Sequence, residues 1–142
     1  MKQYIGTKIV QAEPQELRYR NEAGVDFCEE GYKVRYQDGY ESWSPKDVFE
    51  EAYRETDGMT FGLAIEAAKK GKKIARKGWN GKNQYVQLAR GISYTSPDGE
   101  VVNAEHDAIG NAAFAFCGTS GVQMGWLASQ ADMLAEDWMI VD

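Results

Sequence analysis

Two tryptophans of this 142-residue chain stand beside glycines and polar residues instead of inside apolar runs. Trp79 follows Gly78 in a predicted turn, and Trp126 follows Gly125 near the C-terminus. An aromatic ring in a glycine-flanked turn is poorly placed for a hydrophobic core but well placed to stack on a planar ring of a ligand. Both tryptophans are therefore candidates for ligand binding.

Cationic, amide and hydroxyl side chains accompany these two rings. Lysines and arginines surround Trp79 in the sequence and suit phosphate groups, while the amides and hydroxyls offer uncharged hydrogen bonds. Stacking rings, cations and amides are together what a nucleotide requires, although the same lysines would equally suit a solvated surface. The candidate ligand-binding residues are Trp79, Asn80, Trp126, Ser129, Gln130, Arg76, Lys82 and Tyr85.

Catalytic and metal-binding motifs find no support in the sequence. His106 is the only histidine, so any Ser-His-Asp, Cys-His or histidine-based metal arrangement would depend on it alone. Its neighbours have no motif spacing, which favours a solvated loop histidine over a catalytic one. The chain has neither a P-loop nor a dinucleotide-binding glycine fingerprint, and the adjoining Glu136 and Asp137 cannot face one site together. We predict no catalytic residue, no metal site and no cofactor.

The composition, with 43% hydrophobic and 27% charged residues, is that of a water-soluble globular protein. No apolar run approaches the roughly 18 residues of a transmembrane helix, and the N-terminus lacks the apolar core of a signal peptide. Cys28 and Cys117 are too few and too far apart for a disulfide scaffold or a zinc site, so we expect reduced, buried thiols. These features predict a cytoplasmic protein with no membrane partner.

The net charge of −6 argues against DNA or RNA as a partner, because phosphate contacts need a basic surface. The charge is unevenly distributed along the chain. Residues 1–58 carry 8 Lys and Arg against 13 Asp and Glu, whereas residues 59–142 carry 8 against 9. Seven of the later cations lie between Lys69 and Lys82. An anionic ligand is therefore expected on the second part of the chain.

Residues 1–57 have the pattern of a small module that begins with strands. Tyr4–Val10 is rich in β-forming residues, and Gly31–Tyr36 alternates apolar and polar residues as a half-buried strand does. Asp38-Gly39 follows, and this pair is a strong hairpin-turn signal because its residues tolerate positive φ. The returning strand is expected at residues 41–43.

A helix is predicted directly after this hairpin. Ser44 suits its N-cap and Pro45 its first helical position. The helix should run to about Arg54 and bury an apolar face made of Val48, Phe49, Ala52 and Tyr53. Tyr40 and Trp43 suit either a recognition surface or the core, and we favour the core because so small a module cannot spare aromatics. Residues 31–54 resemble an accessory module of small phage proteins with no assigned activity; the shared pattern is GY.V.Y.DGY.SWSPKDVFE.AYR.

Residues 59–142 form a second module. Thr60 can cap a helix that runs from Phe61 to about Lys70, and Gly71 suits the position after it. Ser129–Asp132 is a capping box that opens a short helical turn. Strands are expected at residues 72–76, with Ile74 pointing inward, and at residues 85–89, 100–102, 113–117 and 138–141. The predicted fold class is α+β, with small antiparallel sheets that each pack with a short helix, in two modules.

Three ordered blocks of the second module resemble one known family. The blocks are residues 59–71 (MTFGLAIEAAKKG), residues 76–82 (RKGWNGK) and residues 125–138 (GWLASQADMLAEDW). In this order and at similar spacing, they closely resemble the Thoeris anti-defence proteins of the signal-sponge type, which are short proteins of phages and prophages. The resemblance covers about residues 59–142.

This resemblance implies both a fold and a function. Family members are small α+β subunits that assemble into homotetramers and bind cyclic ADP-ribose isomers made by bacterial TIR-domain enzymes. They hold this signal without cleaving it, so the Thoeris effector is not triggered, and some relatives also take up cyclic oligonucleotide signals of CBASS defence. We therefore expect a non-catalytic phage anti-defence protein that sequesters a cyclic nucleotide signal in the infected bacterial cytoplasm, as a tetramer with pockets at subunit interfaces.

Two departures from the family bear on the choice of ligand. Many members begin at the first block, whereas this chain carries an acidic module in front, and residues 91–113 and 118–124 match poorly. Trp138 belongs to the third block, but its apolar neighbours favour a core residue over a ligand contact. The alternatives are a structural or adaptor phage protein whose first module docks a partner, and a nucleotide-degrading enzyme.

Overall fold

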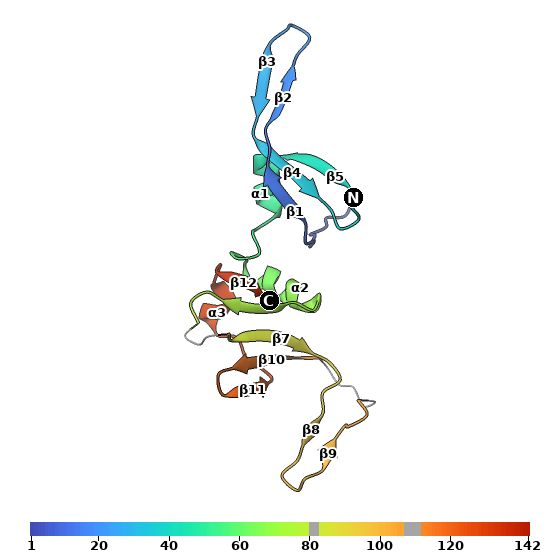
Figure 1. Ribbon diagram of the computed structural model, residues 1–142, viewed down its shortest axis with the longest axis vertical. Helices are drawn as coiled ribbons and strands as arrows, with labels where there is room; N and C mark the ends of the chain where they lie inside the picture. Colours follow the sequence, from blue (N-terminus) through green and yellow to red (C-terminus); the bar gives the residue numbers. More distant parts are fainter. Residues whose placement is uncertain (80–82, 107–111) are drawn as a thin grey trace. The chain divides into compact units, whose positions relative to one another are not determined.

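The computed structural model of the chain describes residues 1–79, 83–106 and 112–142. These residues form two compact units, Met1–Arg54 and Glu55–Asp142 (Figure 1). Both units combine antiparallel strands with short helices, so the predicted α+β fold class is confirmed.

The first unit is built on a three-stranded antiparallel sheet in the order β1-β4-β5. One helix follows β5, and a separate two-stranded ribbon, β2–β3, is inserted between β1 and β4. All eight residues of the ribbon strands are exposed. The elements are β1 (Gln11–Pro14), β2 (Leu17–Arg20), β3 (Asp26–Glu29), β4 (Gly31–Arg35), β5 (Glu41–Pro45) and α1 (Lys46–Ala52).

The hairpin between β4 and β5 forms where the sequence predicts it. Gly39 adopts a φ of +88°, and its N–H donates to the Tyr36 carbonyl over 3.0 Å. Val34 on β4 is buried, and Tyr32 on the same strand stacks on Phe49 of α1 with 4.3 Å between ring centroids. The helix therefore closes one face of this sheet.

Several expectations for the first unit are wrong. The β-rich stretch 4–10 forms no strand, and the first strand instead includes Pro14, which an edge strand tolerates because one side of it needs no donors. The N-cap of α1 is Pro45, not Ser44, and no side chain caps it. Three residues expected in the core, Val48, Ala52 and Tyr40, are exposed. The β2–β3 ribbon was not predicted, and Cys28 on β3 is exposed although we expected a buried thiol.

The second unit is built on a five-stranded antiparallel sheet in the order β11-β10-β7-β6-β12 (Figure 1). Helix α2 packs against β6, β7 and β12, and a separate short ribbon, β8–β9, lies between β7 and β10 in the sequence. The elements are α2 (Phe61–Lys69), β6 (Lys73–Arg76), β7 (Tyr85–Ala89), β8 (Tyr94–Thr95), β9 (Val101–Val102), β10 (Ala113–Gly118), β11 (Gly121–Met124), α3 (Gln130–Leu134) and β12 (Trp138–Val141).

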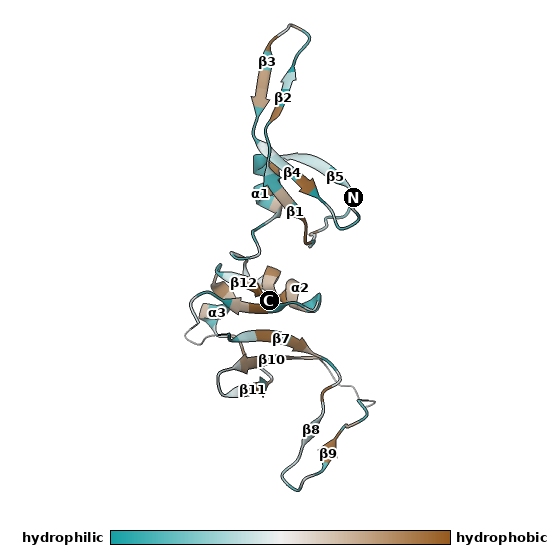
Figure 2. Ribbon diagram, in the orientation of Figure 1, coloured by the Kyte–Doolittle hydropathy of each residue, from teal (hydrophilic) through white to brown (hydrophobic). Residues whose placement is uncertain are grey.

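Helix α2 begins and ends as its sequence predicts. The Thr60 hydroxyl oxygen accepts a hydrogen bond from the Leu63 N–H over 3.3 Å, and Gly71 follows the helix with a φ of +90°. Its small residues let the helix approach the sheet closely, where they meet apolar strand residues (Figure 2). The buried core consists of Met59, Ala64, Ala67, Ala68, Ile74, Val86 and Trp138. The expectation that Trp138 is a core residue is confirmed.

Strand alternation divides the residues of this sheet between two faces. Val86 on β7 pairs with Phe116 on β10 and with Ile74 on β6, and all three belong to the face beneath α2. Tyr85 and Cys117 are one position removed from these residues and therefore lie on the opposite face.

Candidate functional site

Five aromatic rings gather at one end of the core of the second unit. Trp138 of β12 is fully buried at their centre, and Trp79 and Trp126 are half-buried beside it. Neighbouring ring centroids lie 5.4 to 6.5 Å apart. The cluster consists of Phe61, Trp79, Phe116, Trp126 and Trp138. It joins residues from all three blocks that the sequence singled out.

The two candidate stacking residues meet in this cluster. Trp79 and Trp126 lie edge to face with 6.1 Å between centroids and 69° between ring planes, a favourable geometry for aromatic pairs. Both also pack on the hydrophobic core. The expectation that a glycine-flanked turn keeps a ring out of the core is therefore wrong, although each tryptophan retains exposed surface.

Backbone hydrogen bonds fix the position of Trp126. Gly125 adopts a φ of +81°, a conformation that glycine reaches without strain. This turn lets the Gly125 and Trp126 N–H groups both donate to the Phe114 carbonyl, over 2.9 and 3.0 Å. The Trp126 backbone is thereby tied to strand β10.

A capping box orders the segment that follows Trp126. The Ser129 hydroxyl oxygen accepts from the Asp132 N–H over 3.1 Å, and the Asp132 carboxylate accepts from the Ser129 N–H over 3.0 Å. The capping box at Ser129–Asp132 is confirmed. The Asp132 carbonyl also accepts a hydrogen bond from the indole N–H of Trp138 over 2.9 Å. Helix α3 is thus held against the aromatic cluster.

Arg76 lies between two carboxylates. Its Nη1 is 3.0 Å from Asp132 Oδ1, and its Nε is 2.9 Å from Asp137 Oδ1. The hydrogen bonds to Asp137 and then to Asp132 raise the pKa of the Arg76 guanidinium above its ordinary value. Two negative charges therefore oppose this one positive charge, which leaves it less available to a ligand phosphate than the sequence indicates.

The Asp132 carboxylate is the most connected group of the site. Burial by itself would raise the pKa of this carboxyl, but hydrogen bonds from the Ser129 N–H and from Arg76 outweigh burial and lower the pKa below its ordinary value. The carboxylate is thus the favoured form, and it connects helix α3 with Arg76 on strand β6, whose carbonyl accepts from the Trp79 N–H over 3.4 Å.

The other predicted site residues are placed differently. Gln130 is exposed at the first position of α3, whereas the hydroxyl of the neighbouring Ser129 is used as a cap. Tyr85 lies on the face of the sheet opposite Trp79, where Lys73 Nζ is 4.7 Å from its ring centroid. Tyr85 is thus not brought together with the two tryptophans. Asn80 and Lys82 lie outside the described residues.

Two exposed leucines and two long-range ion pairs near the site were not predicted from the sequence. Leu127, directly after Trp126, is 89% exposed, and Leu134 on α3 is 78% exposed. The Arg76 ion pairs span 56 and 61 residues, and only the antiparallel pairing of β6 with β12 brings them together. The two aspartates of the third block, Asp132 and Asp137, were the sequence feature that could have indicated partners for Arg76.

Ionisable clusters elsewhere do not form a comparable site. Within the described part of the chain, no group of three or more His, Cys, Asp or Glu residues is arranged to hold a metal ion. His106 is exposed, in agreement with a solvated loop histidine. None of the described helices has the length and apolar character needed to cross a lipid bilayer.

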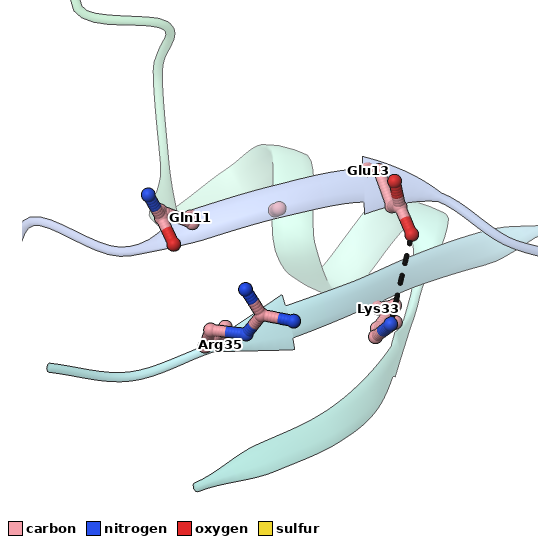
Figure 3. A pocket seen from close by; sticks show the side chains of 5 residues that line it. Gln11, Glu13, Lys33 and Arg35 are labelled. Atoms are coloured by element: carbon pink, nitrogen blue, oxygen red, sulfur yellow. Dashed lines mark ion pairs between the residues drawn. The ribbon is translucent and has the colours of Figure 1, made fainter. Parts of the chain in front are cut away.

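A shallow hollow on the first unit is too small for a nucleotide. Figure 3 shows Gln11 and Glu13 on β1 facing Arg35 and Lys33 on β4. The hollow encloses about 120 Å³, whereas small-molecule sites usually offer roughly 300 Å³ or more. Its cations are also paired, since Lys33 Nζ and Arg35 Nη2 lie 3.2 and 3.1 Å from Glu41. The hollow therefore does not compete with the aromatic cluster as a nucleotide site.

Residues 59–141 match the model of the Tad2-like family, described as the Thoeris anti-defense 2-like domain. The chain belongs to this family. A curated relative, Thoeris anti-defense 2 of Bacillus phage SP01, is 38% identical over 87 residues, which cover 58% of this chain and 94% of the phage protein.

Membership in the Tad2-like family supports a phage anti-defence role. The matched segment coincides with most of the second unit and contains the whole aromatic cluster and the Asp132 hydrogen bonds. The first unit lies outside the match, so it is an addition to the family domain in this chain.

Proposed function

We propose that the second unit binds and sequesters a cyclic nucleotide immune signal, a cyclic ADP-ribose isomer of the Thoeris system, without cleaving it. The observation that carries this proposal is the pairing of Trp79 with Trp126, two half-buried rings that each keep some exposed surface, inside the segment that matches the Tad2-like family. A base can stack on the open surface of either ring, and such stacking is largely insensitive to base identity.

Polar groups close to the two rings suit the remaining parts of such a ligand. The exposed amide of Gln130 can donate to and accept from ribose or base atoms. Exposed Lys77, which follows β6 and precedes Trp79 by two positions, can meet a phosphate.

The groups at the proposed ligand site support sequestration over catalysis. A sequestering protein needs tight binding of the ground state, whereas an enzyme must bind the transition state more tightly. The ionisable groups beside the tryptophans, Asp132, Asp137 and Arg76, are engaged with one another. We further propose a homotetramer with pockets at subunit interfaces, since an 88-residue unit has little surface to enclose a dinucleotide-sized ligand. Cyclic oligonucleotides of CBASS defence are candidates for a second ligand.

Calorimetric titration with a panel of cyclic ADP-ribose isomers and CBASS cyclic oligonucleotides tests this function. A bound signal should raise the melting temperature, because binding only to the folded state stabilises it by RT ln(1 + [L]/Kd). After heat denaturation of the complex, chromatography should recover the signal chemically intact. Absence of heat and of a thermal shift across the panel would favour the adaptor alternative, and a cleaved product would favour the enzyme.

Trp79→Ala should weaken signal binding by about 1–3 kcal/mol if a base stacks on this ring. The matched control is Tyr94→Ala, which removes another exposed aromatic of the same unit from the separate β8–β9 ribbon. The control should bind as the wild type does. Equal affinity of both variants, in proteins that circular dichroism shows to be folded, would mean that Trp79 is only a packing residue.

A further inference from the structure

We infer that Asp132 is the positioning residue of this site: without touching the ligand, its carboxylate holds the Trp126–Gln130 segment and the Trp79 turn in their binding arrangement. The part of this inference that concerns ligand affinity rests on the proposed function. The part that concerns the geometry of the two tryptophans does not.

The hydrogen bonds of Asp132 reach every segment of the site. Oδ2 accepts from the Ser129 N–H over 3.0 Å and Oδ1 accepts from Arg76 Nη1 over 3.0 Å, while the Arg76 carbonyl accepts from the Trp79 N–H over 3.4 Å. The backbone carbonyl of Asp132 accepts from the Trp138 indole. One residue therefore joins helix α3, strand β6, strand β12 and the Trp79 turn.

The chemistry of this carboxylate favours positioning over ligand contact. An ionised carboxylate offers about four acceptor sites, and protein donors already occupy one on each oxygen of Asp132. Its side chain is only 15% exposed, and its negative charge would repel the phosphates of a cyclic nucleotide. Its influence on the ligand must therefore pass through the groups that it holds.

Arg76 and Asp137 complete the arrangement but do not replace Asp132. Arg76 is held at Nε by Asp137, so its Nη1 points at Asp132. The Asp137 carboxylate reaches the site through Arg76, whereas the Asp132 carboxylate binds both Arg76 and the Ser129 N–H at the start of α3. Removing the charge of Asp137 should thus disturb the site less than removing that of Asp132.

The test compares Asp132→Asn with Asp137→Asn and with Thr60→Ala. Thr60 caps α2, so its loss should lower the stability of the second unit by about 1 kcal/mol without changing the site. Thr60→Ala is therefore the control for destabilisation alone. Near-ultraviolet circular dichroism reports the coupled tryptophan rings, and amide hydrogen exchange of residues 125–130 reports the segment itself, both in the absence of ligand.

For Asp132→Asn we expect a changed tryptophan dichroism, faster exchange confined to residues 125–130, and about tenfold weaker binding of the cyclic ADP-ribose isomer that the wild type binds. Asp137→Asn should show smaller changes and Thr60→Ala none. Equal loss of affinity in Asp132→Asn and Thr60→Ala, or wild-type dichroism and exchange in Asp132→Asn, would overturn the inference.

The two possible failures are distinguishable. If the wild type binds no member of the panel, the proposed function fails, while dichroism and hydrogen exchange still decide whether Asp132 positions the tryptophans. If the wild type binds and Asp132→Asn binds equally well, the positioning role fails and the function stands. Should Asp132→Asn not fold, Arg76→Gln breaks the same contact from strand β6 and is expected to give the same changes.

Discussion

A carboxylate that accepts several hydrogen bonds inside a small protein makes the local structure sensitive to acid. Asp132 is such a group, and its pKa in the folded protein lies below its ordinary value because its hydrogen bonds outweigh the effect of burial. A proton added to this carboxylate removes the charge on which the contact with Arg76 depends. Stability and site geometry are thus connected through one residue.

The second unit should lose stability in acid because of Asp132. A carboxyl with a depressed folded-state pKa contributes stability above its unfolded pKa of about 3.9, and this contribution is lost as the pH falls through the folded-state value. Thermal unfolding measured from pH 7 down to pH 2 should therefore show a decline below about pH 4. Asp132→Asn should start from a lower melting temperature and decline less steeply; a parallel decline would contradict this role.

At the scale of elements, the first unit contains a close contact between the backbone of β4 and the ring of Trp43. Gly31 on β4 lies under the ring of Trp43 on β5, and a Cβ at Gly31 would overlap both that ring and the Ser44 carbonyl. The Trp43 indole N–H is fixed by a hydrogen bond to the Gln15 carbonyl over 2.8 Å. The ring therefore has little freedom to move aside.

Gly31→Ala should destabilise the first unit by about 1–3 kcal/mol, the usual cost of overpacking. Hydrogen exchange of the β4 and β5 amides should accelerate, while exchange in the second unit stays unchanged. Gly6→Ala is the matched control, because nothing lies within 4 Å of a Cβ at that position. Equal exchange rates in the two variants would show that the Trp43 ring can move aside without loss of stability.

Elements with local signals could be predicted from the sequence, and elements that depend on distant contacts could not. The cap at Thr60, the capping box at Ser129 and the turn at Gly39 are specified by a few neighbouring residues. Both faces of the β2–β3 ribbon are exposed to solvent, so its sequence lacks the alternation of apolar and polar residues that would predict a half-buried strand. The turn at its tip contains Gly24 at a φ of +82°, the one local signal available.

The candidate site was predicted in composition but not in geometry. The three blocks do meet around Trp79 and Trp126, as a single site requires. Tyr85 was grouped with the two tryptophans, but strand parity puts it on the face opposite Val86, which is buried in the core. The ion pairs of Arg76 were not predicted, because Asp132 and Asp137 lie 56 and 61 positions away from it in the sequence.

At the scale of the whole molecule, exposed apolar side chains bear on assembly. Leu134 on α3 and Leu127 beside Trp126 are mostly exposed. Full burial of a leucine side chain contributes roughly 1.5–3 kcal/mol, so a second subunit that covers these residues would gain stability. Because both residues adjoin the candidate site, the same contact would help to enclose a ligand held at Trp126.

Light scattering at micromolar concentration should report a homotetramer for the wild type. Leu134→Glu should dissociate it, because a buried unpaired charge costs more than the lost apolar contact. Val101→Glu is the matched control: Val101 is also exposed, but it lies on the separate β8–β9 ribbon, so this variant should stay tetrameric. A monomeric wild type that still binds the signal tightly would refute the assembly, whereas a tetrameric Leu134→Glu variant would move the interface away from α3. If the pocket lies between subunits, the dissociated variant should also lose signal affinity, even though Leu134 is not among the residues proposed to touch the ligand.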